Sequence, residues 1–248
     1  ASQKKLGIQK PLVISSELSI KRHNFLSLFK SKSIFTDIKI NPTIKSCQLA
    51  INFNHSLDFD GVISIGGGSV MDTSKIVMAS MATGIKNVSK LIEFSDPFKK
   101  KIPSIFIPTT HGTGSEVTKW GTIWDQTKKK KYSIDHEDLY PSVAILDGSL
   151  TLSLPISTSI VTILDALSHS FEAIWNKNAN ETSTEYAINA ICLILDNVER
   201  LKHEPENLIL RNVLIKASNM AGLAFSNTKT AAAHSISYPL TLYYGIPH

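Results

Sequence analysis

Gly61-Val-Ile-Ser-Ile-Gly-Gly-Gly-Ser-Val-Met-Asp-Thr-Ser-Lys75 is the stretch that decides the fold. Its first half, Gly61–Gly66, is a short apolar run typical of a buried strand. Consecutive glycines turn the chain after it, and a helical pattern runs from about Val70 to Thr83. A strand that turns over glycines into a helix predicts an α/β domain built on a parallel sheet.

The glycine turn is also a candidate ligand site. Glycines carry no Cβ, so their backbone N–H groups can approach a ligand closely, and the start of a helix adds positive partial charge that suits a pyrophosphate. The spacing matches neither Gly-x-Gly-x-x-Gly nor the Walker lysine motif, and a turn without a ligand is the alternative. We favour phosphate binding by Gly66, Gly67, Gly68 and Ser69.

A second loop of this kind follows the predicted strand Ser104–Pro108. It reads Ile107-Pro-Thr-Thr-His-Gly-Thr-Gly-Ser-Glu116 and offers the hydroxyls of Thr109, Thr110 and Thr113. Two such loops at the carboxyl ends of parallel strands predict a nucleotide site at a switch point of the sheet.

Two further residues bear on the cofactor. Ser16 ends the predicted strand Pro11–Ser16, where an acidic residue would bind a ribose 2′-hydroxyl and repel a 2′-phosphate. Serine does neither strongly, so NAD and NADP both stay open. Lys128–Lys131 is most simply a solvated hairpin turn, and Lys131 at its exit is a candidate for the cofactor ribose that charge alone does not establish.

The pattern of elements changes near residue 152. Before it, strands alternate with helices, including a hairpin from Thr118–Trp124 to Tyr132–Ile134, an extended 38–43 segment with Thr43 as helix cap, and a strand over 142–146. After it, only helices are expected: 157–176, 182–203, 206–225 and 229–238. We therefore predict a Rossmann-like domain at 1–152 and an all-α domain at 153–248, with a cleft between them.

Four side chains in the helical half form a candidate metal site. Asp165 and His169 are four residues apart, so they share one face of their helix. By themselves they fit a core hydrogen-bonded pair better than a metal site. His234 and His248 supply two more imidazoles, and one oxygen with three imidazole nitrogens suits a borderline divalent ion such as Fe(II) or Zn(II).

Composition excludes several classes. The 248 residues carry a net charge of +5, with basic residues scattered rather than striped, which argues against nucleic-acid binding. Two distant cysteines make a disulfide framework improbable, and no segment reads as a membrane span, so a soluble cytoplasmic protein is expected. The chain begins inside a predicted helix and stops on a predicted ligand, which indicates a fragment truncated at both ends.

These motifs, taken together, resemble the iron-containing (group III) alcohol dehydrogenases over nearly the whole chain. The carrying residues are Gly-Gly-Gly-Ser-x-x-Asp-x-x-Lys at 66–75, Ile-Pro-Thr-Thr-x-Gly-Thr-Gly-Ser-Glu at 107–116, Asp-Ala-x-x-His at 165–169, and histidines at 234 and 248. The resemblance implies the dehydroquinate synthase-like fold, metal ligation by the four residues above, and cofactor binding by the two loops, Asp72 and Lys131.

The substrate branch rests on finer similarity. The family usually has a second histidine four residues after the first ligand of the last pair, and Tyr238 stands there instead. The 228–241 segment and the 118–125 segment are similar to the branch that reduces phosphonoacetaldehyde to 2-hydroxyethylphosphonate. Tyr238 is then a candidate proton donor, with a metal-bound water as the alternative. Lys229, expected at the start of the last helix, is a candidate for the phosphonate, with a solvated lysine as the alternative.

Other functions stay open at this point. A short neutral alcohol or aldehyde would suit the same family. A sugar-phosphate cyclase would share the two-domain plan and use NAD transiently, although its sequences depart from the two histidine motifs. A non-catalytic nucleotide-binding remnant is the third alternative. The expected partner is a small molecule, with no nucleic acid and no membrane; a homodimer is allowed, because the sequence does not determine the oligomeric state.

Overall fold

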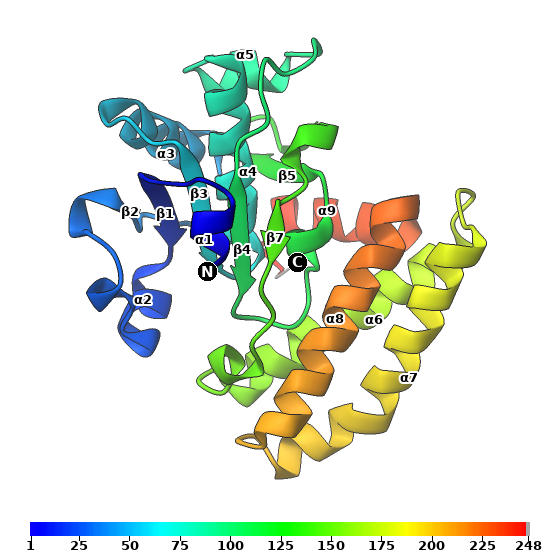
Figure 1. The fold of residues 1–248 in the computed structure, drawn as a ribbon. Coiled ribbons are helices and arrows are strands. Elements are labelled where there is room, and N and C mark those ends of the chain that lie inside the picture. The colour runs from blue at the N-terminus through cyan, green and yellow to red at the C-terminus, as the bar shows by residue number, and fades with distance from the viewer. Residues whose placement is uncertain (247–248) are drawn as a thin grey trace. The chain divides into compact units, whose positions relative to one another are not determined.

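Five strands form one sheet in the order β2-β1-β3-β4-β7 (Figure 1). The computed structural model describes residues 1–246, without the side chain of Leu26. β1 pairs in parallel with both β2 and β3, and β4 pairs in parallel with β7. The strands are β1 (Pro11–Ser15), β2 (Ile34–Phe35), β3 (Gly61–Gly66), β4 (Ser104–Pro108) and β7 (Val143–Ala144).

Both faces of this sheet are covered. Leu12 and Ile14 of β1 belong to one apolar cluster, whereas Val13 between them belongs to another. The first cluster is completed by helices α3 (Ile44–Ser56), α4 (Gly68–Thr83) and α5 (Val88–Ile92) and by a hairpin of β5 (Trp120–Asp125) and β6 (Lys130–Asp135). The second includes Ile20 of α2 (Glu17–His23). Burial on both faces explains the near-continuous apolar runs of β1 and β3.

The chain divides by packing into two compact units. The first comprises Ala1–Ile107 with Lys119–Ile145, and the second comprises Pro108–Thr118 with the residues from Leu146 onward. The second unit therefore takes in the loop that follows β4. Three of its helices share an apolar core: α6 (Ile156–Trp175), α7 (Glu181–His203) and α8 (Leu208–Thr228). A fourth helix, α9 (Ala232–Tyr244), and the 3-10 turns η3 (Ser115–Val117) and η5 (Gly148–Thr151) complete it.

The predicted order of elements, α/β followed by all-α, is confirmed. The four predicted strands β1, β3, β4 and β7 and the hairpin are present, and Thr43 caps α3 in a reciprocal box with Ser46. The boundary at residue 152 between the two predicted domains stays a prediction.

Several local predictions were wrong. The sequence of residues 19–30 reads as one helix, but the structure has α2 followed by a 3-10 turn, because Asn24 adopts the left-handed region and ends α2. β2 was missed because it has only two residues. The last helix begins at Ala232 rather than 229, and it continues past Pro239, which removes only one backbone donor from its interior.

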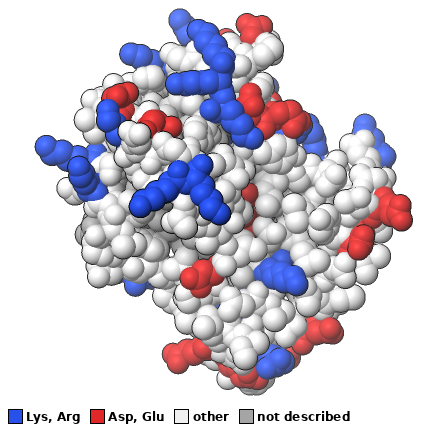
Figure 2. Space-filling model, in the orientation of Figure 1, with Lys and Arg blue, Asp and Glu red and all other residues white. Residues whose placement is uncertain are grey.

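Helix α8 reaches the length and apolar composition of a membrane span, which the sequence analysis did not anticipate. It packs against α6 and α7, and it carries the fully buried Arg211. On the face shown in Figure 2, the Lys and Arg side chains are interspersed with Asp and Glu, in keeping with the scattered charge of the sequence.

Candidate metal centre

Helix α6 presents three ionisable side chains on one face. Asp165, His169 and Glu172 are separated by four and three residues, which places them one above another along the helix. His169 and Glu172 are buried, and Asp165 is half-buried. They are the only ionisable side chains of α6, whose other residues are apolar or carry a hydroxyl group.

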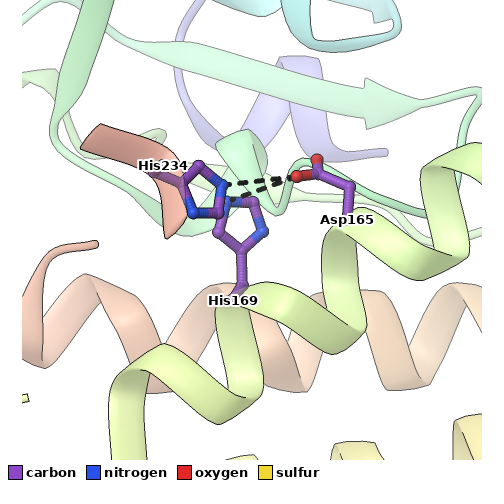
Figure 3. A group of neighbouring side chains, drawn as sticks. All are labelled: Asp165, His169 and His234. Carbon is purple, nitrogen blue, oxygen red and sulfur yellow. Dashed lines mark ion pairs between the residues drawn. The ribbon is translucent and has the colours of Figure 1, made fainter. Parts of the chain in front are cut away.

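Helix α9 brings His234 to the same point. The Asp165 Oδ1 atom lies 3.4 Å from His234 Nε2 and 3.9 Å from His169 Nε2. The two imidazole rings are stacked with centroids 4.3 Å apart (Figure 3). One ligand atom from each residue lies within 4.8 Å of the other two. Of the predicted set, these three residues are therefore brought together; His248 lies outside the described residues.

Glu172 holds His234 from the other side of its ring. Its Oε2 is hydrogen-bonded to His234 Nδ1, and its Oε1 accepts from the His234 backbone N–H at 3.2 Å. Since an ionised carboxylate only accepts, Nδ1 carries the proton. In the neutral ring this tautomer leaves Nε2, the atom nearest Asp165, as the nitrogen whose lone pair a cation would bind in place of a proton. Carboxylates commonly orient metal-binding imidazoles in this way.

The charges of the cluster are mutually supporting. Burial acts to raise the pKa of Glu172, but a backbone hydrogen bond at Ala231 and the neighbouring His234 outweigh it and lower that pKa. Burial acts to lower the pKa of His234, but Asp165 and Glu172 outweigh it and raise that pKa. Two carboxylates around two imidazoles make a local excess of negative charge that a cation would neutralise.

The donor set fits a divalent ion of borderline softness. Carboxylate oxygen and imidazole nitrogen are ligands of Fe(II) and Zn(II) alike. The 3.4 and 3.9 Å separations lie within the span of two ligands that each bond a shared ion at about 2.1 Å, roughly 4.2 Å at most. Phe225 of α8 stacks on His169 with centroids 4.1 Å apart and so fixes the ring plane.

The predicted residues around the last helix fall in different places. Tyr238 is one turn after His234 on α9, and its hydroxyl lies 3.4 Å from Thr230 Oγ1. The predicted position of Lys229 was wrong, because Lys229 is the C-cap of α8 with φ +68° and not the first turn of α9. The Lys229 carbonyl accepts a hydrogen bond from Asn176 Nδ2 at 3.2 Å. Lys229 therefore lies in the connection between α8 and α9.

The glycine turn lies where it was predicted, between β3 and α4 in the first unit. Gly67 is the N-cap of α4, so Gly68 and Ser69 lie in the first helical turn, with Asp72 one turn later. A Cβ on Gly66 would lie 2.5 Å from Val70 Cγ2, so close packing alone requires that glycine. Ser69 Oγ accepts from the Asn41 N–H at 3.2 Å.

The other two candidates of the first unit have local structural roles. Ser16 is the N-cap of α2, where its hydroxyl accepts from the Ser19 N–H at 3.1 Å. Lys131 is the second residue of β6 and pairs with Trp124 across the hairpin.

The threonine loop after β4 packs on helices α6 and α8. Thr109 is buried, and Thr110 and Thr113 are half-buried. Glu116 Oε1 accepts from Asn219 Nδ2 at 2.9 Å. Gly114 has φ +56°, and a Cβ there would lie 2.4 Å from the Gly222 Cα, so this glycine is needed for both conformation and space.

Sequence reasoning missed three residues of this unit. Glu172 could have been found, because it continues the face of Asp165 and His169 at helical spacing. His111 and Arg211 are in contact although 100 positions apart. No local pattern connects them, so only the fold reveals the pair.

The structure thus combines an α/β unit, whose sheet is covered on both faces, with a helical unit that carries an Asp-His-His cluster able to hold a metal ion. The chain belongs to the iron-containing alcohol dehydrogenase family. The family model "Iron-containing alcohol dehydrogenase" matches residues 1–148, and "Fe-containing alcohol dehydrogenase family, C-terminal" matches residues 159–248.

Individual relatives agree with this assignment. The long-chain-alcohol dehydrogenase 1 of Geobacillus thermodenitrificans is 35% identical over 220 residues, 88% of this chain and 55% of that protein. The NAD-dependent methanol dehydrogenase of Bacillus methanolicus is 32% identical, over 87% of this chain and 56% of that protein. The chain thus spans about half the length of the curated relatives it matches.

Solved structures show the same fold. The sulfoacetaldehyde reductase of Bifidobacterium kashiwanohense, in complex with NAD+, superposes with a TM-score of 0.90 at 30% identity. That match covers 99% of this chain and 67% of the reductase. An iron-containing alcohol dehydrogenase matches with a TM-score of 0.87, also at 30% identity, over 99% of this chain and 68% of that one.

Proposed function

We propose that this chain forms the cofactor- and metal-binding part of an enzyme that reduces a small aldehyde to a primary alcohol with NADH or NADPH. The observation that carries the proposal is the Asp165, His169 and His234 cluster in a chain of this family. Fe(II) is the favoured ion and Zn(II) the alternative.

Each ligand has a defined task. Asp165, His169 and His234 would hold the ion, with His248 proposed as the fourth ligand from the family motif. A divalent ion held by these residues would supply Lewis acidity toward an aldehyde oxygen. Glu172 keeps the His234 ring turned and its Nδ1 protonated, so that Nε2 is the binding atom.

Two backbone segments are proposed to bind the nicotinamide nucleotide. In the first unit these are Gly66, Gly67, Gly68, Ser69 and Asp72, at the N-terminus of the 16-residue helix α4, whose dipole favours a pyrophosphate. In the second unit they are Thr109, Thr110 and Thr113. Ser16 and Lys131 are proposed to lie near the ribose. NAD is favoured by the NAD+ complex of the sulfoacetaldehyde reductase, and NADP stays open.

Tyr238 is the proposed proton donor. It lies one turn after His234 on the same helix, and Thr230 Oγ1 is 3.4 Å from its hydroxyl. A phenol hydroxyl can give a proton to an alkoxide and regain one from water.

The proposed substrate is a two-carbon aldehyde that carries an anionic group, phosphonoacetaldehyde first and sulfoacetaldehyde second. The 228–241 segment around Tyr238 supports phosphonoacetaldehyde, because it is similar to the branch of the family that reduces this aldehyde. The similarity to a sulfoacetaldehyde reductase supports the same shape and charge class. Lys229 is the proposed cation for the anionic group. Short neutral alcohols stay the alternative, since methanol and 1-propanol dehydrogenases are among the relatives.

A direct assay tests the proposal. The protein loaded with Fe(II) is mixed with NADH or NADPH and with phosphonoacetaldehyde, sulfoacetaldehyde or propanal, and the loss of absorbance at about 340 nm is followed. We expect consumption of NADH with the anionic aldehydes. No net consumption with any aldehyde, together with turnover of a sugar phosphate, would favour a cyclase. Cofactor binding without turnover would favour a non-catalytic protein.

Replacing Lys229 tests the substrate class separately. We expect Lys229→Ala to raise KM for the anionic aldehydes about tenfold and to leave KM for propanal unchanged, because only the former lose an ion pair. Lys216→Ala, an exposed lysine on α8, is the matched control. An equal effect of Lys229→Ala on charged and neutral aldehydes would contradict the assignment.

A further inference from the structure

We propose that His111 is a positioning residue for the threonine loop of the cofactor site, and that it acts through a hydrogen bond from the buried guanidinium of Arg211. The inference rests on the proposed function, because it assigns the loop to a nicotinamide nucleotide. His111 is buried and stands between Thr110 and Thr113, in the middle of the candidate binding segment.

Arg211 is the anchor of the loop in the helical unit. It lies on α8, is fully buried and donates from Nε to the Pro205 carbonyl at 2.9 Å. Its Nη1 donates to Ser159 Oγ of α6 at 2.7 Å and approaches His111 Nε2 at 3.1 Å. Arg211 therefore ties the loop to both helices.

The hydrogen-bond chemistry defines the state of His111. A guanidinium only donates, so Nε2 of His111 must be the acceptor and Nδ1 must carry the proton. Nδ1 lies 3.4 Å from Thr162 Oγ1 of α6, which can accept a hydrogen bond from the Nδ1–H group. Burial, and then the charge of Arg211, lower the pKa of His111 to about 4, which agrees with a neutral ring at pH 7.

The loop lies directly on the helices at this point. A Cβ on Gly112 would lie 2.5 Å from the Thr162 carbonyl oxygen, and one on Gly114 would meet Gly222. Glu116 is bonded to Asn219 of α8 at the far end. These contacts hold the second half of the loop, and the His111–Arg211 hydrogen bond holds the residue that directly follows Thr109 and Thr110 in its first half.

A purely structural role is the alternative, since a buried arginine needs acceptors wherever it lies. The two roles differ in what happens when the bond is lost and the fold is kept. A positioning role predicts a change confined to the loop and to nucleotide affinity. A structural role predicts lower stability alone.

The test compares His111→Phe with His111→Gln, whose side-chain oxygen can accept from Arg211. NADH affinity is measured by fluorescence titration, and backbone hydrogen exchange is measured over residues 109–116. We expect His111→Phe to weaken NADH binding at least about tenfold and to speed exchange in the loop, and His111→Gln to stay within about threefold of the wild type. His55→Phe, which alters a histidine bonded to Ser80 in the first unit, is the matched control.

Two results would overturn the proposal: wild-type affinity and exchange in folded His111→Phe, or equal loss in both variants. If the wild-type protein binds no NADH, the proposed function fails instead, and loop exchange still decides whether His111 holds the loop. If His111→Phe does not fold, nitrogen NMR of the wild-type ring replaces it. A neutral ring protonated on Nδ1 at pH 7 supports the proposal, and a charged ring or one protonated on Nε2 overturns it.

Discussion

At the scale of single residues, the metal cluster depends on one carboxylate that is not itself a proposed ligand. Glu172 is fully buried and makes two hydrogen bonds to His234, one to the ring and one to the backbone. It therefore controls both the position and the tautomer of a ligand supplied by another helix.

We expect Glu172→Gln to lower the affinity for Fe(II) or Zn(II) by about 10- to 100-fold. The substitution removes a negative charge, and the new amide no longer fixes the Nδ1–H tautomer of His234. Isothermal titration of the metal-free protein measures the change. Glu185→Gln, an exposed carboxylate on α7, should leave affinity unaltered. Unchanged affinity in Glu172→Gln would show that His234 needs no such support.

His111 predicts an acid dependence of stability. Its pKa is about 4 in the folded protein and 6.5 ordinarily, so the unfolded chain takes up a proton that the folded chain does not. The free energy of unfolding should therefore fall as the pH decreases from 6.5 toward 4, by at most about 3 kcal/mol for this group. Denaturant unfolding at several pH values should show a shallower fall for His111→Gln. Parallel curves for the two proteins would contradict the buried neutral state.

At the scale of elements, the sequence predicted those helices and strands whose signals lie within one short stretch of chain. The strand, glycine turn and helix at 61–83 are confirmed because strand burial, turn and helix all agree in one short stretch. The predicted start of α9 was wrong because Lys229 is the C-cap of α8 with φ +68°. Lysine is not a residue type that predicts a positive φ. The contact between His111 and Arg211 could not be predicted from the sequence, because it forms only when the loop packs on α8.

The crossing of the loop over α8 predicts a strong effect of one methyl group. Gly114→Ala would place a Cβ 2.4 Å from the Gly222 Cα at φ +56°. We expect it to lower the free energy of unfolding by about 2 to 4 kcal/mol, measured by denaturant unfolding. Gly84→Ala shares the positive φ but has no atom within 4 Å, so it should cost only about 1 kcal/mol. Equal losses in the two variants would mean that backbone conformation, not the close approach, sets the requirement.

At the scale of the whole molecule, the two units carry different parts of the proposed chemistry. The first unit holds the glycine turn, and the second holds the threonine loop and the metal cluster. The family was predictable because four motifs occur in the right order over nearly the entire chain. The membership of the threonine loop in the helical unit was not, because the loop directly continues a strand of the sheet and only its packing assigns it.

Metal titration of the purified chain tests the central claim most directly. The metal-free protein is titrated with Fe(II) under anaerobic conditions, and bound iron is counted after gel filtration. We predict one tightly bound ion per chain in the wild type and none in His169→Ala or His234→Ala. One ion per chain at unchanged affinity in both variants would contradict the account.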